Sequence, residues 1–178
     1  MYELGPDNGR LTIHTTRAGV AARAGHDLVI EAGRWRATLS GEPLQLQAEI
    51  DATSLLVRDG TGGVKPLTDS DREEIGKNIE QKVLNTGQHP TISFASTGGR
   101  MLDEHRWQVD GNLTLAGTTV PVQVPVEVEP DPDGIRLRAT VTVVQSRFGI
   151  KPYTAMMGAL KVADEVEIRA EATAPASR

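Results

Sequence analysis

The sequence predicts an all-β fold, an eight-stranded antiparallel barrel with one inserted α-helix at about residues 70–86, in a single domain over residues 1–178. Most stretches alternate apolar and polar residues with a period of two, which is typical of strands with one buried face. Short turns join these stretches, and one stretch alone has helical spacing of its apolar residues. Such strands form an up-and-down barrel or a sandwich, and a change of parity at a glycine favours the barrel.

Composition limits the class of protein. The 178 residues, 38% of them hydrophobic, suit one domain with its own core. Cysteine is absent, which excludes thiolate catalysis and cysteine metal sites. The net charge is -5 and Lys and Arg are spread along the chain, which argues against nucleic acid and anionic membrane surfaces as main partners. Without a basic stretch followed by an apolar run, or about 18 consecutive apolar residues, we expect a cytoplasmic protein with no stable membrane insertion.

The first strands are predicted at residues 10–16, 27–39 and 44–51. In the second of them the apolar parity changes at Gly33, which we interpret as a β-bulge that helps the sheet to bend. Residues 41–43 supply a turn before the third strand. Residues 51–67 are expected to hold a short extended piece at 54–57 and then a Gly-rich segment, either a linker or a mobile flap.

The helix at residues 70–86 is predicted from one apolar stripe. Ser70 and Glu73 fit a capping box, in which each side chain accepts a backbone N–H of the first turn. Asn85 and Gly87 are signals for its end. The helix is expected to plug or flank whatever the strands enclose. Its inward stripe consists of Ile75, Ile79 and Val83.

Five strands follow the helix. Asp110 and Gly111 lie within an alternation of unchanged parity, so we reject a hairpin there and place Gly111 inside a strand. Pro121 and Pro125 share the second face of their strand and indicate an exposed or irregular edge. The predicted strands cover residues 91–97, 107–115, 120–128, 135–143 and 162–172.

The interior of this barrel has few bulky side chains, since the chain holds two Phe, two Trp and two Tyr. An eight-stranded barrel is either filled by side chains or holds one small ligand, depending on their size. An empty pocket of roughly 300 Å³ would cost roughly 7 kcal/mol at about 24 cal/mol per Å³. That cost is comparable with the whole stability of a domain. The barrel therefore flattens, takes in the helix as a plug, or admits an apolar guest.

The predicted lining comes from inward positions of the strands, from the helix stripe and from the connection at residues 146–161. It consists of Ile13, Leu28, Ile30, Leu39, Leu46, Ile50, Ile79, Val83, Phe94, Leu113, Val122, Val124, Leu137, Val141, Phe148, Met156, Met157 and Ile168.

His26 and Asp27, at a strand start, form the best-placed polar pair. Three interpretations stay open: contact with the head group of a ligand, a general base or haem ligand, and a histidine that satisfies the backbone at the barrel rim. His14, His89 and His105 have no ligand-like spacing, so no metal site is expected.

Two segments resemble a known family. Residues 90–97 resemble the P-x-I-x-F-x-S segment of the YceI-like, polyisoprenoid-binding, lipocalin-like proteins, and residues 109–122 resemble their G-D-L-T-x-x-G-x-T-x-x-V signature. The resemblance implies a lipocalin-like barrel around an apolar tunnel for a long isoprenoid or fatty chain, often in a dimer. Residues 71–75 and 83–85 stand where the family usually has R-D-x-H-L and then paired Phe and Asp, without that His or the Phe pair.

The leading hypothesis is a non-enzymatic carrier, reservoir or sensor for a long apolar molecule such as a polyisoprenoid, quinone or fatty acid, with no other cofactor and no nucleic acid partner. A homodimer is the expected assembly. One alternative is a small enzyme or haem barrel that uses His26 with Asp27. Another is a protein-interaction module that docks a partner at residues 121–129 or at the loop around Gly60.

Overall fold

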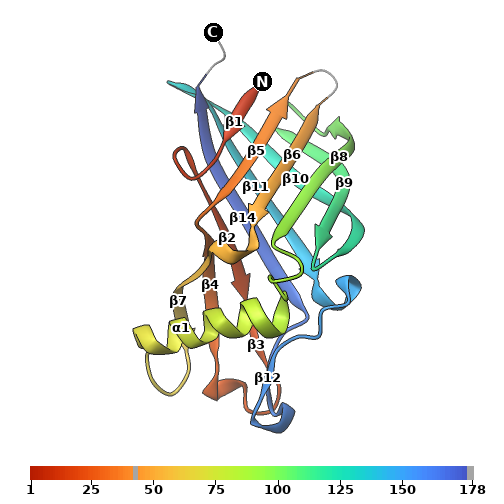
Figure 1. Cartoon of the computed structure of the whole chain (residues 1–178). Coiled ribbons are helices and arrows are strands. Elements are labelled where there is room, and N and C mark those ends of the chain that lie inside the picture. The colour runs from red at the N-terminus through yellow and green to blue at the C-terminus, as the bar shows by residue number, and fades with distance from the viewer. Residues whose placement is uncertain (42–43, 176–178) are drawn as a thin grey trace.

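The computed structural model describes residues 1–41 and 44–175, so the turn predicted at residues 41–43 lies partly outside the described residues. Its main element is a strongly curled antiparallel sheet, accompanied by one α-helix and a small second sheet (Figure 1). The large sheet consists of β1 (Tyr2–Leu4), β2 (Gly9–Thr15), β4 (His26–Ala32), β5 (Trp35–Ser40), β6 (Gln45–Asp51), β7 (Leu55–Gly62), β8 (Thr91–Met101), β9 (Arg106–Leu115), β10 (Thr118–Asp131), β11 (Gly134–Val144) and β14 (Glu165–Pro175).

The remaining elements are short, apart from the helix. The small sheet consists of β3 (Arg17–Ala18), β12 (Thr154–Ala155) and β13 (Leu160–Val162). The helix is α1 (Asp69–Asn78), followed by a π-helical turn (Ile79–Val83). Within the described residues, no helix is long and apolar enough to cross a membrane. Single 3-10 turns lie at Ala22–Ala24, Ala52–Ser54, Gln145–Phe148 and Met156–Gly158.

The predicted count of eight strands is not confirmed, because the large sheet has eleven, in the order β1-β5-β6-β8-β9-β10-β11-β14-β2-β4-β7. The strand predicted at residues 27–39 is divided into β4 and β5. β7 occupies much of the stretch where the sequence predicted a short piece and a Gly-rich segment. The short β1 was not predicted.

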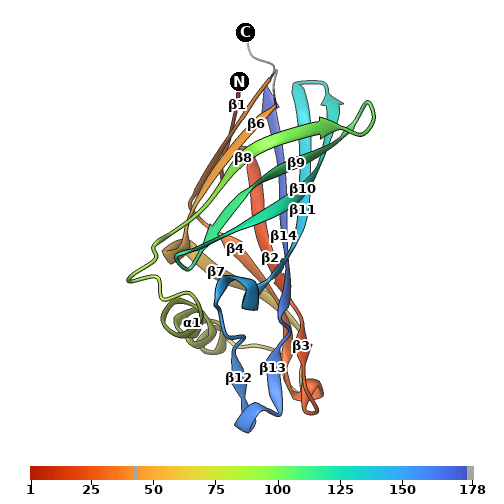
Figure 2. The same cartoon turned by 90° about the vertical axis from the view of Figure 1, so that its right-hand side faces the viewer.

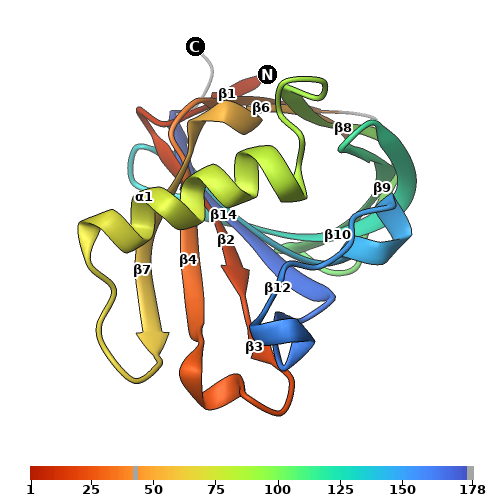
Figure 3. The ribbon, with the colours of Figure 1, turned by 60° about the horizontal axis from the view of Figure 1, so that its bottom comes forward.

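Gly33 marks a break between two strands and not the predicted bulge within one. The Gly33 N–H donates to the Ser54 carbonyl at 2.9 Å, and the Asp51 N–H donates to the Arg34 carbonyl at 3.0 Å. These bonds connect the β4/β7 pair to the β5/β6 pair, so residues 26–62 form one long bent hairpin. β5 and β4 lie towards opposite ends of the strand order, so this hairpin joins the ends and the sheet curls round on itself (Figures 2 and 3).

The helix begins two residues earlier than the predicted capping box requires. Thr68 is the N-cap: its hydroxyl accepts from the Asp71 N–H at 3.2 Å, and the Asp71 carboxylate accepts from the Thr68 N–H at 2.8 Å. The capping box predicted at Ser70 and Glu73 is therefore wrong. Thr68 and Asp71 satisfy the same pattern, and Leu67 is fixed just before them because it packs against Gly60, where a Cβ would lie 2.3 Å from its methyl carbon. The π-helical turn ends at Val83 with Leu84 as its C-cap, and Asn85 has a positive φ of 50°.

Two substitutions separate these capping assignments. We expect Thr68→Ala to lower the free energy of unfolding by about 1 kcal/mol, the usual cost of losing an N-cap side chain. Ser70→Ala, in an exposed position of the first turn, should change it by less than about 0.5 kcal/mol. Urea unfolding followed by circular dichroism measures both values, and equal losses in the two variants would contradict the assignment.

The same cap carries a pH dependence. Hydrogen bonds from the Thr68 backbone and then its side chain lower the pKa of Asp71. A carboxyl group with a lowered pKa in the folded state stabilises the fold above its ordinary pKa, and this contribution is lost as the pH falls through the lowered value. The difference in stability between wild type and Thr68→Ala should therefore shrink in acid. Unfolding curves at neutral and acidic pH test this, and a constant difference would count against it.

Gly111 lies inside β9, as predicted, paired with Ser96 on one side and Val122 on the other. A Cβ at Gly111 would lie 2.3 Å from the Phe94 ring, so the glycine makes room for that ring. The chain turns instead at Ala116 and Gly117, whose positive φ angles of 48° and 78° suit a two-residue hairpin.

The edge predicted from the two prolines is also present. Among the described residues, β11 pairs with β10 only from Val126 to Asp131, so the first part of β10 pairs with β9 alone. Pro121 and Pro125 are exposed in this part, where their missing N–H groups leave no ladder bond unmade.

The interior divides into two halves along the barrel axis. The half towards the chain termini is packed by buried side chains, among them Leu39, which pairs with Tyr2, and the cross-strand pair of Val109 and Val124. The half at the opposite end, here called the lower end, lies beside α1 (Figure 1). The cavity described below lies in that lower half.

Candidate ligand-binding cavity

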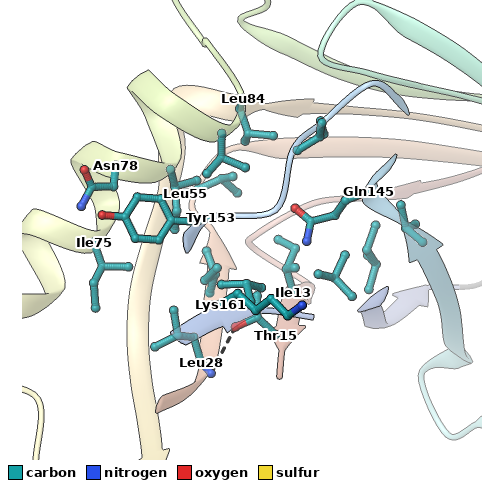
Figure 4. A pocket seen from close by; sticks show the side chains of 18 of the residues that line it. Ile13, Thr15, Leu28, Leu55, Ile75, Asn78, Leu84, Gln145, Tyr153 and Lys161 are labelled. Atoms are coloured by element: carbon teal, nitrogen blue, oxygen red, sulfur yellow. Dashed lines mark hydrogen bonds between the residues drawn. The ribbon is translucent and has the colours of Figure 1, made fainter. Parts of the chain in front are cut away.

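A cavity of about 310 Å³ occupies the lower half of the curled sheet. Its walls come from β2, β4 and β7, from α1 with its π-helical turn, and from residues 143–168 (Figure 4). At its inner limit lie Ile92 and Leu113, next to the layer that holds Phe94. Apolar side chains make up most of the wall.

Eight of the predicted lining residues meet at this cavity. They come from five strands and from the π-helical turn, which the fold brings together from distant parts of the chain. They are Ile13, Leu28, Ile30, Ile50, Ile79, Val83, Leu113 and Ile168.

The helix is a wall of the cavity and does not plug the barrel. The predicted stripe of Ile75, Ile79 and Val83 is half-buried and faces the cavity along its whole length. Tyr153 faces the helix from the opposite wall (Figure 4), and the Lys82 ammonium lies 5.9 Å from the centre of its ring. The stripe was therefore placed correctly from spacing alone, although the cap was not.

Ten predicted lining residues lie elsewhere. Most of them lie in the core of the filled half or pack against it. Phe148 is buried beside the first part of β10. Met156 and Met157 are exposed on the turn between β12 and β13, so the prediction that they line the interior is wrong. The full set outside the cavity is Leu39, Leu46, Phe94, Val122, Val124, Leu137, Val141, Phe148, Met156 and Met157.

Sequence reasoning also missed part of the wall. Leu11 and Val143 have the same parity as predicted residues on their strands, so their inward direction was visible in the sequence, but their height along the axis was not. Leu55 lies in β7, within the short extended piece expected at residues 54–57, which was not assigned to the wall. The large apolar residues missed are Leu11, Leu55, Leu84, Ile92, Leu115, Val143, Ile150, Leu160, Val162 and Val166.

Polar groups are few and gather in the lower part of the cavity. Gln145 is buried and donates to the Ala163 carbonyl at 3.0 Å. The Thr15 hydroxyl accepts from the Leu28 N–H at 3.3 Å. Asn78 adds an amide beside Tyr153, and Lys161 adds an ammonium near Ile13 and Thr15 (Figure 4). This end of the cavity can hydrogen-bond one polar group of an otherwise apolar molecule.

His26 and Asp27 do not act as a pair. His26 lines the cavity, and its Nε2 lies 2.8 Å from the Lys65 carbonyl oxygen. Asp27 instead accepts from the Arg17 N–H at 2.8 Å, with the Arg17 guanidinium 3.8 Å away. Of the three interpretations, the backbone contact at the rim matches the geometry, whereas within residues 1–41 and 44–175 no carboxylate hydrogen-bonds to His26 to orient it as a general base. Among the described residues, no three acidic or histidine side chains gather as a metal site.

A comparison with protein families matches residues 2–174 to a family model described as the YceI-like domain. A curated relative, a UPF0312 protein of Azotobacter vinelandii, is 39% identical over 57 residues. That match spans 32% of this chain and only 30% of the length of the relative.

Solved structures show the same fold at low sequence identity. BcnA of Burkholderia cenocepacia has a TM-score of 0.70 at 17% identity, over 92% of this chain and 94% of that one. The YCEI protein of Campylobacter jejuni has a TM-score of 0.65 at 15% identity, over 84% and 85%. A polyisoprenoid binding domain from Saccharophagus degradans, implicated in plant cell wall breakdown, has a TM-score of 0.59 at 10% identity, over 99% and 98%.

Proposed function

We propose that this chain, which belongs to the YceI-like domain family, binds one long apolar molecule in the cavity beside α1 as a non-enzymatic carrier, reservoir or sensor. The family expected from residues 90–97 and 109–122 is thus confirmed. The observation that carries the proposal is a cavity of about 310 Å³ with an almost wholly apolar wall. A related fold in Saccharophagus degradans is described as polyisoprenoid binding, which supports an isoprenoid as the ligand class.

Energetics supports an occupant. Left empty, a cavity of this volume would cost roughly 7 kcal/mol at about 24 cal/mol per Å³. Burying ten methylene groups at about 0.8 kcal/mol each would instead supply roughly 8 kcal/mol before the entropy of association is subtracted. No catalytic group is needed for such binding.

The positions of the polar groups in the cavity favour one orientation of the ligand. We place its apolar chain against Ile92 and Leu113 at the inner limit of the cavity. Its polar end then lies near Asn78, Tyr153 and Lys161 in the lower part. A small uncharged or anionic head group, such as a hydroxyl, a quinone carbonyl or a carboxylate, matches these donors.

Native mass spectrometry and solvent extraction of the purified protein test the proposal. We expect one co-purifying apolar molecule per chain, or uptake of one equivalent of a C20 isoprenoid alcohol, a quinone or palmitic acid. Protein that is repeatedly empty, and that takes up none of these three probes, would refute the carrier function and leave the fold assignment intact.

A further inference from the structure

Three loops at the lower end of the molecule expose large apolar side chains. Val20 is 96% exposed between β3 and β4, and Val64 is 81% exposed between β7 and α1. Met156 and Met157 are 60% and 107% exposed between β12 and β13. Figures 1 and 3 show the three loops projecting from the same end of the molecule. We call Val20, Val64, Met156 and Met157 the apolar tips.

The tip formed by the two methionines is held in a strained backbone. Met156 and Met157 have positive φ angles of 51° and 56°, a region that residues with a side chain seldom occupy. The cost of such a conformation is usually balanced by a functional gain. Here the conformation directs two flexible apolar side chains largely into solvent.

The loops that carry the tips are basic. Residues 16–26, 60–67 and 151–162 contain five Lys and Arg and no Asp or Glu, although the chain as a whole has a net charge of -5. Arg23, Lys65, Lys151 and Lys161 are exposed. Of the acids nearest to them, Asp27 is paired with Arg17, and Asp69 with Arg72. The lower end therefore combines apolar tips with loops that carry exposed Lys and Arg and no acid of their own.

The cavity extends to this end. Ala24, Gly25, Ala155 and Leu160 line its lower part, and they belong to the loops that carry Val20 and the two methionines. An apolar ligand that leaves the cavity past these residues would enter water unless another apolar phase covered the exit. A lipid bilayer is such a phase.

We infer that the lower end docks reversibly on an anionic lipid bilayer, with the apolar tips in the head-group region and Arg23 and Lys65 against lipid phosphates. A surface that combines exposed apolar side chains with Lys and Arg has the chemistry of interfacial membrane binding. The role of docking rests on the proposed function: on the bilayer, an apolar ligand could pass between the lipid and the cavity without crossing water.

Sedimentation with vesicles of phosphatidylcholine, with and without phosphatidylglycerol, tests the inference. Wild type should bind the mixed vesicles at least about tenfold more tightly than the neutral ones, and added salt should weaken that binding. A tip variant, Val20→Ser/Val64→Ser/Met156→Ser/Met157→Ser, and a charge variant, Arg23→Glu/Lys65→Glu, should each lose about tenfold or more. All six positions are exposed, so unchanged circular dichroism spectra are expected.

A matched control comes from the opposite end of the molecule. Met101 and Leu102 are also exposed apolar residues, and Met101→Ser/Leu102→Ser should bind the mixed vesicles as wild type does. Wild-type protein that ignores mixed vesicles, or a control variant that loses as much as the tip variant, would overturn the docking surface. So would a tip variant that only converts a dimer to a monomer in size-exclusion chromatography, because the tips would then contact a second copy.

Ligand loading separates the two proposals. Native mass spectrometry of the tip variant with the C20 isoprenoid alcohol, added from solvent, should show the same uptake as wild type, because no tip lines the cavity. Uptake without vesicle binding would refute docking and keep the carrier function. Vesicle binding without uptake of any probe would refute the carrier function and keep the docking surface.

Discussion

Val83→Phe is expected to weaken the binding of an apolar ligand about 50-fold. Val83 faces the cavity from the π-helical turn, and the larger ring would occupy space that a ligand needs. Displacing about three buried methylene groups, at about 0.8 kcal/mol each, amounts to roughly 2.4 kcal/mol. Titration of the protein with a C20 isoprenoid alcohol, followed by native mass spectrometry, measures the change.

The same substitution should not destabilise the empty protein, because the added ring fills volume that is otherwise unoccupied. Leu56→Phe is the matched control, since Leu56 is next to the lining residue Leu55 but half-exposed on the other face of β7. Equal loss of binding in both variants, or full binding by a folded Val83→Phe, would contradict the assignment of this cavity as the ligand site.

The inward face of each strand could be predicted from the sequence, whereas the height of a residue along the barrel could not. Ile13 and Leu137 are both inward, but Ile13 lines the cavity and Leu137 lies in the filled half. Alternation with a period of two reports only the face. Height depends on register, such as the pairing of Ile13 with Ile168 and with Ile30, and a single sequence does not contain the register.

The sequence pattern did not distinguish two local structures at Gly33 and at the start of the helix. A change of parity at Gly33 fits a bulge within one strand and equally a break between two strands. Thr68 with Asp71 and Ser70 with Glu73 both fit a capping box. In each case a contact outside the local pattern decides between the two structures: the Ser54 carbonyl accepts from the Gly33 N–H, and Leu67 packs against Gly60.

The distribution of charge over the surface could not be predicted from the sequence. Lys and Arg are spread along the chain, which argued against an anionic surface as a partner. The fold nevertheless gathers residues 16–26, 60–67 and 151–162 at one end, where their positive charges lie together without acids of their own. Net charge describes the average attraction of the whole molecule to charged partners, but the fold determines where on the surface the charges lie.

Phe94→Ala is expected to lower the free energy of unfolding by about 3–5 kcal/mol, as for other buried aromatic residues. Phe94 is buried in the layer next to Ile92 and Leu113, so its loss would also extend the cavity towards the chain termini. The variant should therefore accept a longer isoprenoid chain than wild type. Urea unfolding and native mass spectrometry with isoprenoid alcohols of increasing length measure the two effects.

Gly111→Ala is expected to cost about 1–3 kcal/mol on its own, because the added methyl group meets the Phe94 ring at 2.3 Å and the Ala95 carbonyl oxygen at 2.7 Å. In the double variant with Phe94→Ala the ring is gone but the Ala95 carbonyl remains. The double variant should therefore lose less free energy of unfolding than the sum of the two single variants, but more than Phe94→Ala alone. Val126→Ala, buried further along β10, should instead be additive with Gly111→Ala. Additivity in both pairs would mean that Phe94 does not rest on Gly111, and the inner limit of the cavity would then have to be formed by other residues.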